Sequence, residues 1–85
     1  MAFLIRGKGV PVTRRALLQR INRRLKDEGE VVYAARGTQA RRDLGDYYRL
    51  DLSRNAVIEK DVNPEALGRK LGVLQQYEYL RAREG

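Results

Sequence analysis

The 85-residue chain contains no cysteine and no histidine. Without cysteine it cannot form disulfides, zinc–thiolate sites, iron–sulfur clusters or a thiol nucleophile. Without histidine it lacks the commonest metal ligand and the commonest general base. It also has no run of 18 apolar residues, so we expect no segment to span a membrane. We therefore expect a cytoplasmic protein with no cofactor, no metal site and no small-molecule substrate.

Catalysis would have to rely on carboxylates, lysine or tyrosine. A metal-dependent nuclease would use Asp51 on one strand with Glu59 and Lys60 on the next. Glu59 and Lys60 are adjacent, so their side chains would point to opposite faces of a strand. Solvated hairpin charges are the simpler interpretation. The sequence therefore predicts that the protein is not an enzyme.

Acidic residues are absent from residues 1–26, which carry eight arginines and lysines. The net charge of +7 thus comes entirely from the first third of the chain. Such asymmetry is typical of a protein with a polyanionic partner, either nucleic acid or an anionic membrane surface. The alternative is a general bias toward arginine, which supplies 14 of the 18 cations and would give a basic surface with no partner.

Residues 13–28 are expected to form a helix that begins at Thr13 and ends at Gly29. Leu17, Ile21 and Leu25 form an apolar stripe on it. The opposite face carries Arg15, Gln19, Arg23 and Lys26, while Arg20 and Arg24 lie on one flank. A second helix is predicted over residues 64–71, because Asn63 is a favourable cap and proline is favourable in the first turn.

Three strands are predicted between the helices, over residues 30–36, 46–52 and 56–60, with a loop over 36–45. Residues 53–55 form the tight turn of a hairpin, and Asn55 can adopt a positive φ. The alternation in DYYRLDL assigns Tyr48, Leu50 and Leu52 to the buried face and Tyr47, Arg49 and Asp51 to the solvated face. Either face of the first strand could be the buried one.

The resulting fold class is α+β, in the order α-β-β-β-α, with a three-stranded antiparallel sheet and two helices packed on one face. Residues 13–85 form a single domain, preceded by an N-terminal arm or short edge strand over residues 1–12. Residues 74–85 are either a further short helix or a tail that packs its tyrosines loosely. The expected core comprises Leu17, Ile21, Leu25, Tyr48, Leu50, Ile58, Leu67 and Leu71.

Three segments carry a resemblance: DLGDYYRLD over residues 43–51, Arg54-Asn55, and NPEAL with LGVL within residues 63–74. In these segments the chain resembles short uncharacterised bacterial proteins found near mobile genetic elements. The resemblance covers roughly residues 11–80 and implies no activity. The order α-β-β-β-α is also similar to that of the double-stranded RNA-binding domain. That family has a basic cluster at the start of its second helix, where this chain has Glu65, so no site residue is carried over.

The first functional hypothesis is a nucleic-acid-binding protein that contacts phosphates of DNA or RNA with little sequence readout. Tyr33 and Tyr47 are candidate stacking residues. The second hypothesis is a protein-interaction module or a homo-oligomeric module that self-associates through its N-terminal arm. Its contact surface would comprise the apolar arm around Phe3, Leu4 and Ile5, the solvated face of the sheet and the tyrosine-bearing tail. The candidate phosphate-binding residues are Arg14, Arg15, Arg23, Lys26, Arg41 and Arg42.

Overall fold

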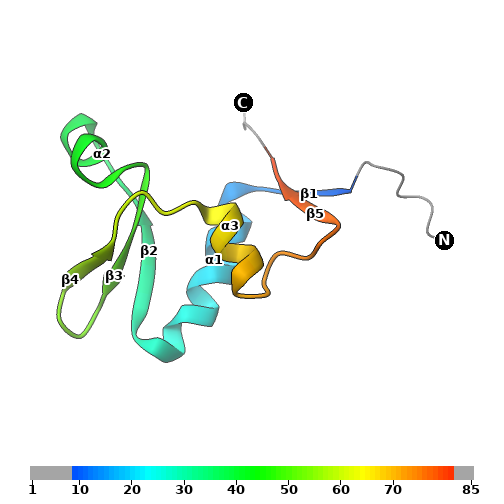
Figure 1. Cartoon of the computed structure of the whole chain (residues 1–85), viewed down its shortest axis with the longest axis horizontal. Coiled ribbons are helices and arrows are strands. Elements are labelled where there is room, and N and C mark those ends of the chain that lie inside the picture. Colours follow the sequence, from blue (N-terminus) through cyan, green and yellow to red (C-terminus); the bar gives the residue numbers. More distant parts are fainter. Residues whose placement is uncertain (1–8, 82–85) are drawn as a thin grey trace.

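The computed structural model describes residues 9–81, and it has a mixed α+β fold (Figure 1). Strands β2, β3 and β4 form a three-stranded antiparallel sheet, while β1 and β5 form a separate parallel pair. The expected α+β class and three-stranded sheet are confirmed. In chain order the elements are β1 (Val10–Val12), α1 (Arg14–Leu25), the 3₁₀ turn η2 (Lys26–Glu28), β2 (Glu30–Ala34), α2 (Thr38–Leu44), β3 (Tyr47–Asp51), β4 (Ala56–Glu59), α3 (Pro64–Lys70) and β5 (Glu78–Leu80).

Both predicted helices begin at the expected caps. The Thr13 hydroxyl accepts a hydrogen bond from the Ala16 N–H at 3.1 Å, and α1 with η2 ends at Gly29. The Asn63 side chain accepts hydrogen bonds from two N–H groups in the first turn of α3, at 3.0 and 3.1 Å. These caps satisfy N–H groups that have no partner within the helix, which is why they mark helix starts so reliably.

The predicted order α-β-β-β-α is wrong in two places. Residues 36–45 are not a loop, because they contain helix α2. The glycines at both ends of this segment mark the boundaries of a helix built from good helix formers such as Ala40, Arg41 and Arg42. Strand β5 was not predicted, whereas β1 lies in the segment that was expected to be an arm or short edge strand.

Strand β1 pairs in parallel with β5, so that Val10 lies opposite Glu78 and Val12 opposite Leu80. Residues 74–85 were expected to form a helix or a loose tail, but Leu74 is buried in the core and residues 78–80 are a strand. The predicted arm around Phe3, Leu4 and Ile5 lies outside the described residues.

The predicted faces of the hairpin are inverted. The register pairs Val32 with Arg49 and Ala34 with Tyr47, so these residues share the face toward the helices. Tyr47 packs against the core there, whereas Tyr48 and its partner Tyr33 face away. Alternation shows which residues share a face, but both faces of DYYRLDL carry a tyrosine, so it does not show which face is buried.

Charge on the buried face of the hairpin is neutralised locally. Arg49 lies 3.0 Å from the Glu59 carboxylate and 3.6 Å from that of Glu30. Its guanidinium is thus held between two acids, one from each neighbouring strand. This pairing allows Arg49, which was predicted to face solvent, to lie on the side of the sheet toward the helices without leaving an isolated buried charge.

The core lies between α1, α3 and the inner face of the sheet. Leu17, Ile21, Leu25 and Leu67 are buried as expected, and Leu71 is partly buried against them. The expectation is wrong for Tyr48 and Leu50, which lie on the outer face, and for Ile58, which is 42% exposed. The remaining buried members of the core are Val12, Val32, Val62 and Leu74.

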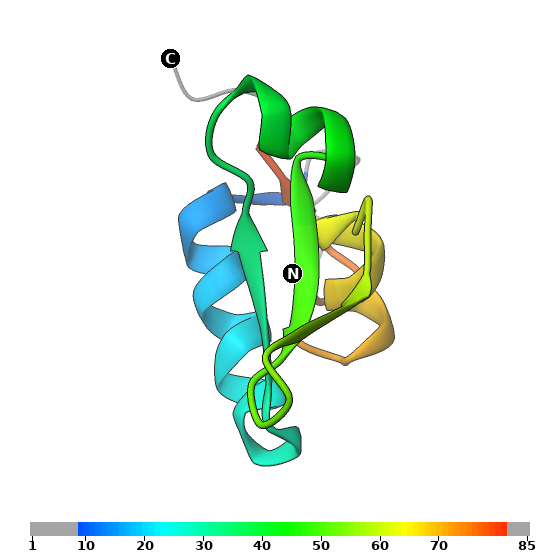
Figure 2. The ribbon, with the colours of Figure 1, turned by 90° about the vertical axis from the view of Figure 1, so that its left-hand side faces the viewer.

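Helices α1 and α3 lie on the same side of the sheet, and Figure 2 looks onto the other side, which no element of residues 9–81 covers. We call this uncovered side the open sheet face. The open sheet face is lined by Val31, Tyr33, Tyr48, Leu50 and Val57.

None of the helices within residues 9–81 is long and apolar enough to cross a membrane.

Candidate nucleic-acid interface

Three of the six candidate phosphate-binding residues share one face of α1. Arg15 lies in the first turn, Arg23 in the last turn, and Lys26 in η2 directly after it. With Leu18, Gln19 and Asn22 they line a shallow hollow of about 610 Å³. Spacings of about four residues place such side chains on one side of a helix, along about 16 Å of its length. We call Arg15, Arg23 and Lys26 the basic face of α1.

The cations of the basic face differ from those on its flank. In the part of the chain that the structure describes, no carboxylate forms an ion pair with Arg15, Arg23 or Lys26. On the flank, Arg20 pairs with Glu78 at 2.9 Å and Arg24 with Glu28 at 3.4 Å. Helix α1 itself contains no acidic residue. The basic face therefore carries positive charge that no ion pair within the described chain neutralises.

The other three candidates lie nearer to α2. Arg14, in the first turn of α1, lines a hollow of about 460 Å³ together with Arg41 of α2. Asp46 also lines this hollow. Arg42 is exposed in the last turn of α2 and lines neither hollow. The structure thus brings Arg14 and Arg41 together, although α2 was expected to be a loop.

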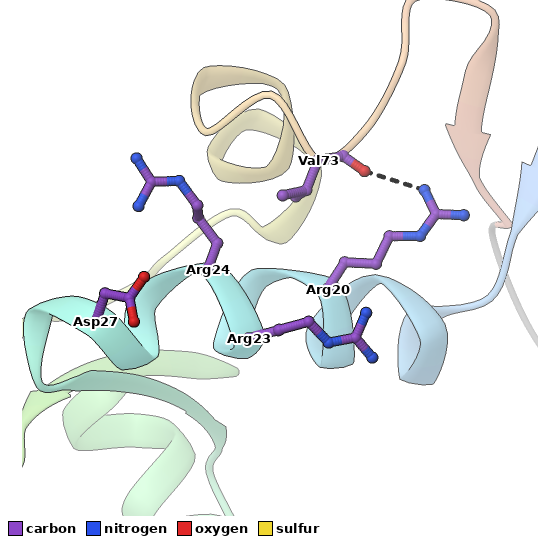
Figure 3. Close-up of a pocket in the computed structure, with 5 residues that line it drawn as sticks. All are labelled: Arg20, Arg23, Arg24, Asp27 and Val73. Carbon is purple, nitrogen blue, oxygen red and sulfur yellow. Dashed lines mark hydrogen bonds between the residues drawn. The ribbon is translucent and has the colours of Figure 1, made fainter.

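Arg20 connects α1 to the chain beyond α3. Its guanidinium donates to the Val73 carbonyl at 3.0 Å (Figure 3). It also donates to both carboxylate oxygens of Glu78, at 2.9 and 3.3 Å. Figure 3 also shows Arg23 and Arg24 leaving the helix in other directions. Arg20, Arg23, Arg24, Asp27 and Val73 line a hollow of about 530 Å³ there. Arg20 is consequently engaged in holding the fold together.

We call the contacts of Arg20 with Val73 and Glu78 the junction. Glu78 is the buried partner in this junction and is only 8% exposed. The hydrogen bonds from Arg20, and then the N–H of Gln75, hold the pKa of Glu78 below its ordinary value. The same interaction raises the pKa of Arg20. Both shifts favour the charged pair. The sequence showed no sign of it, because the two residues lie 58 positions apart.

We expect this junction to make the fold sensitive to acid. Because the pKa of Glu78 is lower in the folded than in the unfolded chain, its contribution to stability is complete above about pH 4.3. That contribution is lost as the pH falls through the lowered pKa. The urea midpoint of the unaltered protein should therefore decrease more steeply below about pH 4.5 than that of Glu78→Gln.

Glu28→Gln is the matched control, because it removes an exposed carboxylate that also pairs with an arginine of α1. Its acid profile should follow that of the unaltered protein. If Glu78→Gln lost stability in acid as steeply as the unaltered chain, the junction would not be the acid-sensitive element.

The carboxylates considered for nuclease chemistry have structural partners. Asp51 accepts hydrogen bonds from the N–H and hydroxyl of Ser53, at 3.0 and 2.9 Å, which with the Arg54 N–H keep its pKa below the ordinary value. Glu59 pairs with Arg49. Within residues 9–81, no group of three or more acidic side chains is placed to hold a metal ion.

Two tyrosines, Tyr33 and Tyr48, lie on the open sheet face. The rings of Tyr33 and Tyr48 have centroids 6.0 Å apart and are tilted by 52°. Tyr33 was one of the two candidate stacking residues, and it is 45% exposed. The other candidate, Tyr47, packs against the core. Its place is taken by Tyr48, which sequence analysis had assigned to the core.

No protein-family model matches this chain, and no curated protein or solved structure is significantly similar to it. The resemblance to short bacterial proteins near mobile genetic elements therefore stays a prediction.

Proposed function

We propose that this is a small, non-enzymatic, cytoplasmic protein that binds nucleic acid through phosphate contacts with little sequence specificity. The observation that carries the proposal is the basic face of α1. Arg15, Arg23 and Lys26 lie along one side of a helix with no acidic residue, and no carboxylate of residues 9–81 pairs with them. Cations arranged in this way release condensed counterions when they meet phosphates, which drives association.

The first turn of α1 supports the same function. Arg14 and Arg15 lie at the positive end of the helix dipole, where acidic residues are normally favoured. An incoming phosphate would accept hydrogen bonds there and offset the unfavourable placement. Arg14, which precedes Arg15 in the chain, lines one hollow with Arg41. Contacts of this kind fix the position of a nucleic acid without reading its bases.

Salt dependence tests this proposal. Engagement of about four phosphates of duplex DNA would give a log–log salt slope near −3.6, at roughly −0.9 per contact. Replacing Arg15, Arg23 and Lys26 together by glutamine should flatten this slope by about two to three units. The same variant should keep its thermal stability within about 0.5 kcal/mol, because the three side chains are exposed. Fluorescence anisotropy over a salt series measures the slope.

The matched control replaces Lys60, Lys70 and Arg81 by glutamine, which removes the same charge from exposed positions outside α1. Its slope should stay close to that of the unaltered protein. Equal flattening in both variants would mean that overall charge, rather than the basic face of α1, controls binding. If the unaltered protein bound neither DNA nor RNA at low salt, the proposal would be wrong.

The second candidate is a protein-interaction or homo-oligomeric module. It is favoured by the exposed apolar residues of the hairpin, since Leu52 is 52% exposed, Ile58 42% and Val57 40%. Strand β4 is also at the edge of its sheet, where a strand from another chain could pair. Concentration-dependent sedimentation in the absence of nucleic acid would favour this second function.

A further inference from the structure

The open sheet face has an unusual composition for a surface in so charged a protein. The side chains that the register places on it come from three neighbouring strands, and all of them are apolar or aromatic. Tyr33 and Tyr48 lie directly opposite each other in the register and form a two-ring surface. The sheet therefore presents an uncharged platform with an exposed aromatic ring, uncovered by any part of residues 9–81 (Figure 2).

This platform lies next to the basic face of α1. Asn22 accepts a hydrogen bond from the Val32 N–H at 2.7 Å and donates one to the Val32 carbonyl at 3.1 Å. Asn22 also lines the hollow that contains Arg15 and Arg23. The basic face is thus fastened along the outer edge of β2. Tyr33 follows Val32 in that strand and points to the opposite side of the sheet.

A single nucleic-acid strand has chemistry that fits both surfaces at once. Its phosphates would meet the cations of α1, and its unpaired bases could cross the edge of β2 and stack on the rings. Base–aromatic stacking tolerates any sequence, because every base has a π face. Bases of a duplex are stacked on one another and cannot reach such a platform.

We infer that the open sheet face is a stacking platform for the bases of single-stranded nucleic acid, with Tyr33 as its main contact. This inference rests on the proposed function, since the basic face of α1 supplies the phosphate contacts. A protein partner would gain less from this location, because the charge beside the platform has one sign and no acid of the described chain pairs with it.

The first experiment uses the unaltered protein and three labelled probes at one low salt concentration. The probes are a single strand of mixed sequence, an abasic strand of the same length, and the corresponding duplex. The base-bearing strand should bind about 5- to 150-fold more tightly than the abasic strand, corresponding to one stacked base. The two single strands should show equal salt slopes, because they carry the same phosphates.

The second experiment compares two substitutions at one position. Tyr33→Leu should remove the preference for bases and leave binding of the abasic strand unchanged. Tyr33→Phe keeps a ring and should keep the preference. Circular dichroism monitors folding of both variants. Should Tyr33→Leu fail to fold, the comparison of base-bearing and abasic strands on the unaltered protein still tests whether bases stack on the open sheet face.

The outcomes separate this inference from the function on which it rests. Equal affinity for base-bearing and abasic strands would overturn the stacking platform and leave phosphate binding intact. Absence of binding to all three probes would overturn both. A dimer in sedimentation that Tyr33→Leu dissociates, without any preference for bases, would show that a second copy covers this face and would also overturn the inference.

Discussion

Replacement of Asn22 by leucine is expected to destabilise the fold by about 2–5 kcal/mol, because a buried backbone donor and acceptor would both lose their partner. The Asn22 amide serves the N–H and the carbonyl of Val32, and Val32 is only 2% exposed. Leucine fills similar space but offers no hydrogen bond. Urea unfolding measures the loss as a lower midpoint at an unchanged slope.

Two further variants make this prediction specific. Asn22→Asp keeps an acceptor for the Val32 N–H but places a carboxylate against the carbonyl, so its stability should lie below that of the unaltered protein. Gln19→Leu is the matched control, because it introduces leucine at an exposed position of the same face and should change stability by no more than about 0.5 kcal/mol. An unchanged midpoint for Asn22→Leu would mean that water satisfies Val32 equally well.

The second large effect is expected for Gly45→Ala, at about 3 kcal/mol or more. Gly45 has φ +84° and ψ −174°, a region of conformational space that is almost restricted to glycine and costs other residues about 1–3 kcal/mol. A Cβ atom there would also collide with the Asp61 carboxylate and lie 2.8 Å from the Asp61 Cα. The Asp61 N–H donates to the Leu44 carbonyl at 2.9 Å. Moving the segment around Gly45 away from Asp61 would therefore break this hydrogen bond.

Gly72→Ala is the control that separates backbone strain from collision. Gly72 also has a positive φ, +77°, but no heavy atom lies within 4 Å of the position its Cβ would take. It should therefore show the strain alone, with a cost of about 1 kcal/mol. Thermal unfolding compares the two variants. A melting temperature for Gly45→Ala no lower than that for Gly72→Ala would show that the Asp61 contact yields.

Helix boundaries could be predicted from the sequence because they depend on neighbours in the chain. Thr13 and Asn63 each bond to N–H groups two or three residues ahead. The orientation of the hairpin depends instead on which side of β2 faces α1. Contacts between α1 and β2 fix that side, among them the hydrogen bonds between Asn22 and Val32, ten residues apart, and the burial of Val32 in the core. A pattern with aromatic residues on both faces contains no information about such a contact.

In the candidate site, too, features set by neighbours in the chain could be predicted and features set by distant contacts could not. The grouping of Arg15, Arg23 and Lys26 follows from the period of a helix and could be anticipated. The proximity of Arg14 to Arg41 depends on the position of α2, which was not recognised. The Tyr33–Tyr48 pair depends on the register between two strands, and the wrong face for β3 concealed it.

The pairing of β1 with β5 also constrains when the fold can be completed during biosynthesis. Val12 leaves the ribosome 68 residues ahead of its partner Leu80. At about 5–20 residues per second, the two are separated by about 3–14 s. Leu67 and Leu74, which belong to the same core as α1, also emerge late. Until those residues emerge, the apolar stripe of α1 can be covered only in part, and closing the parallel pair is a late event that carries the entropic cost of a very long loop.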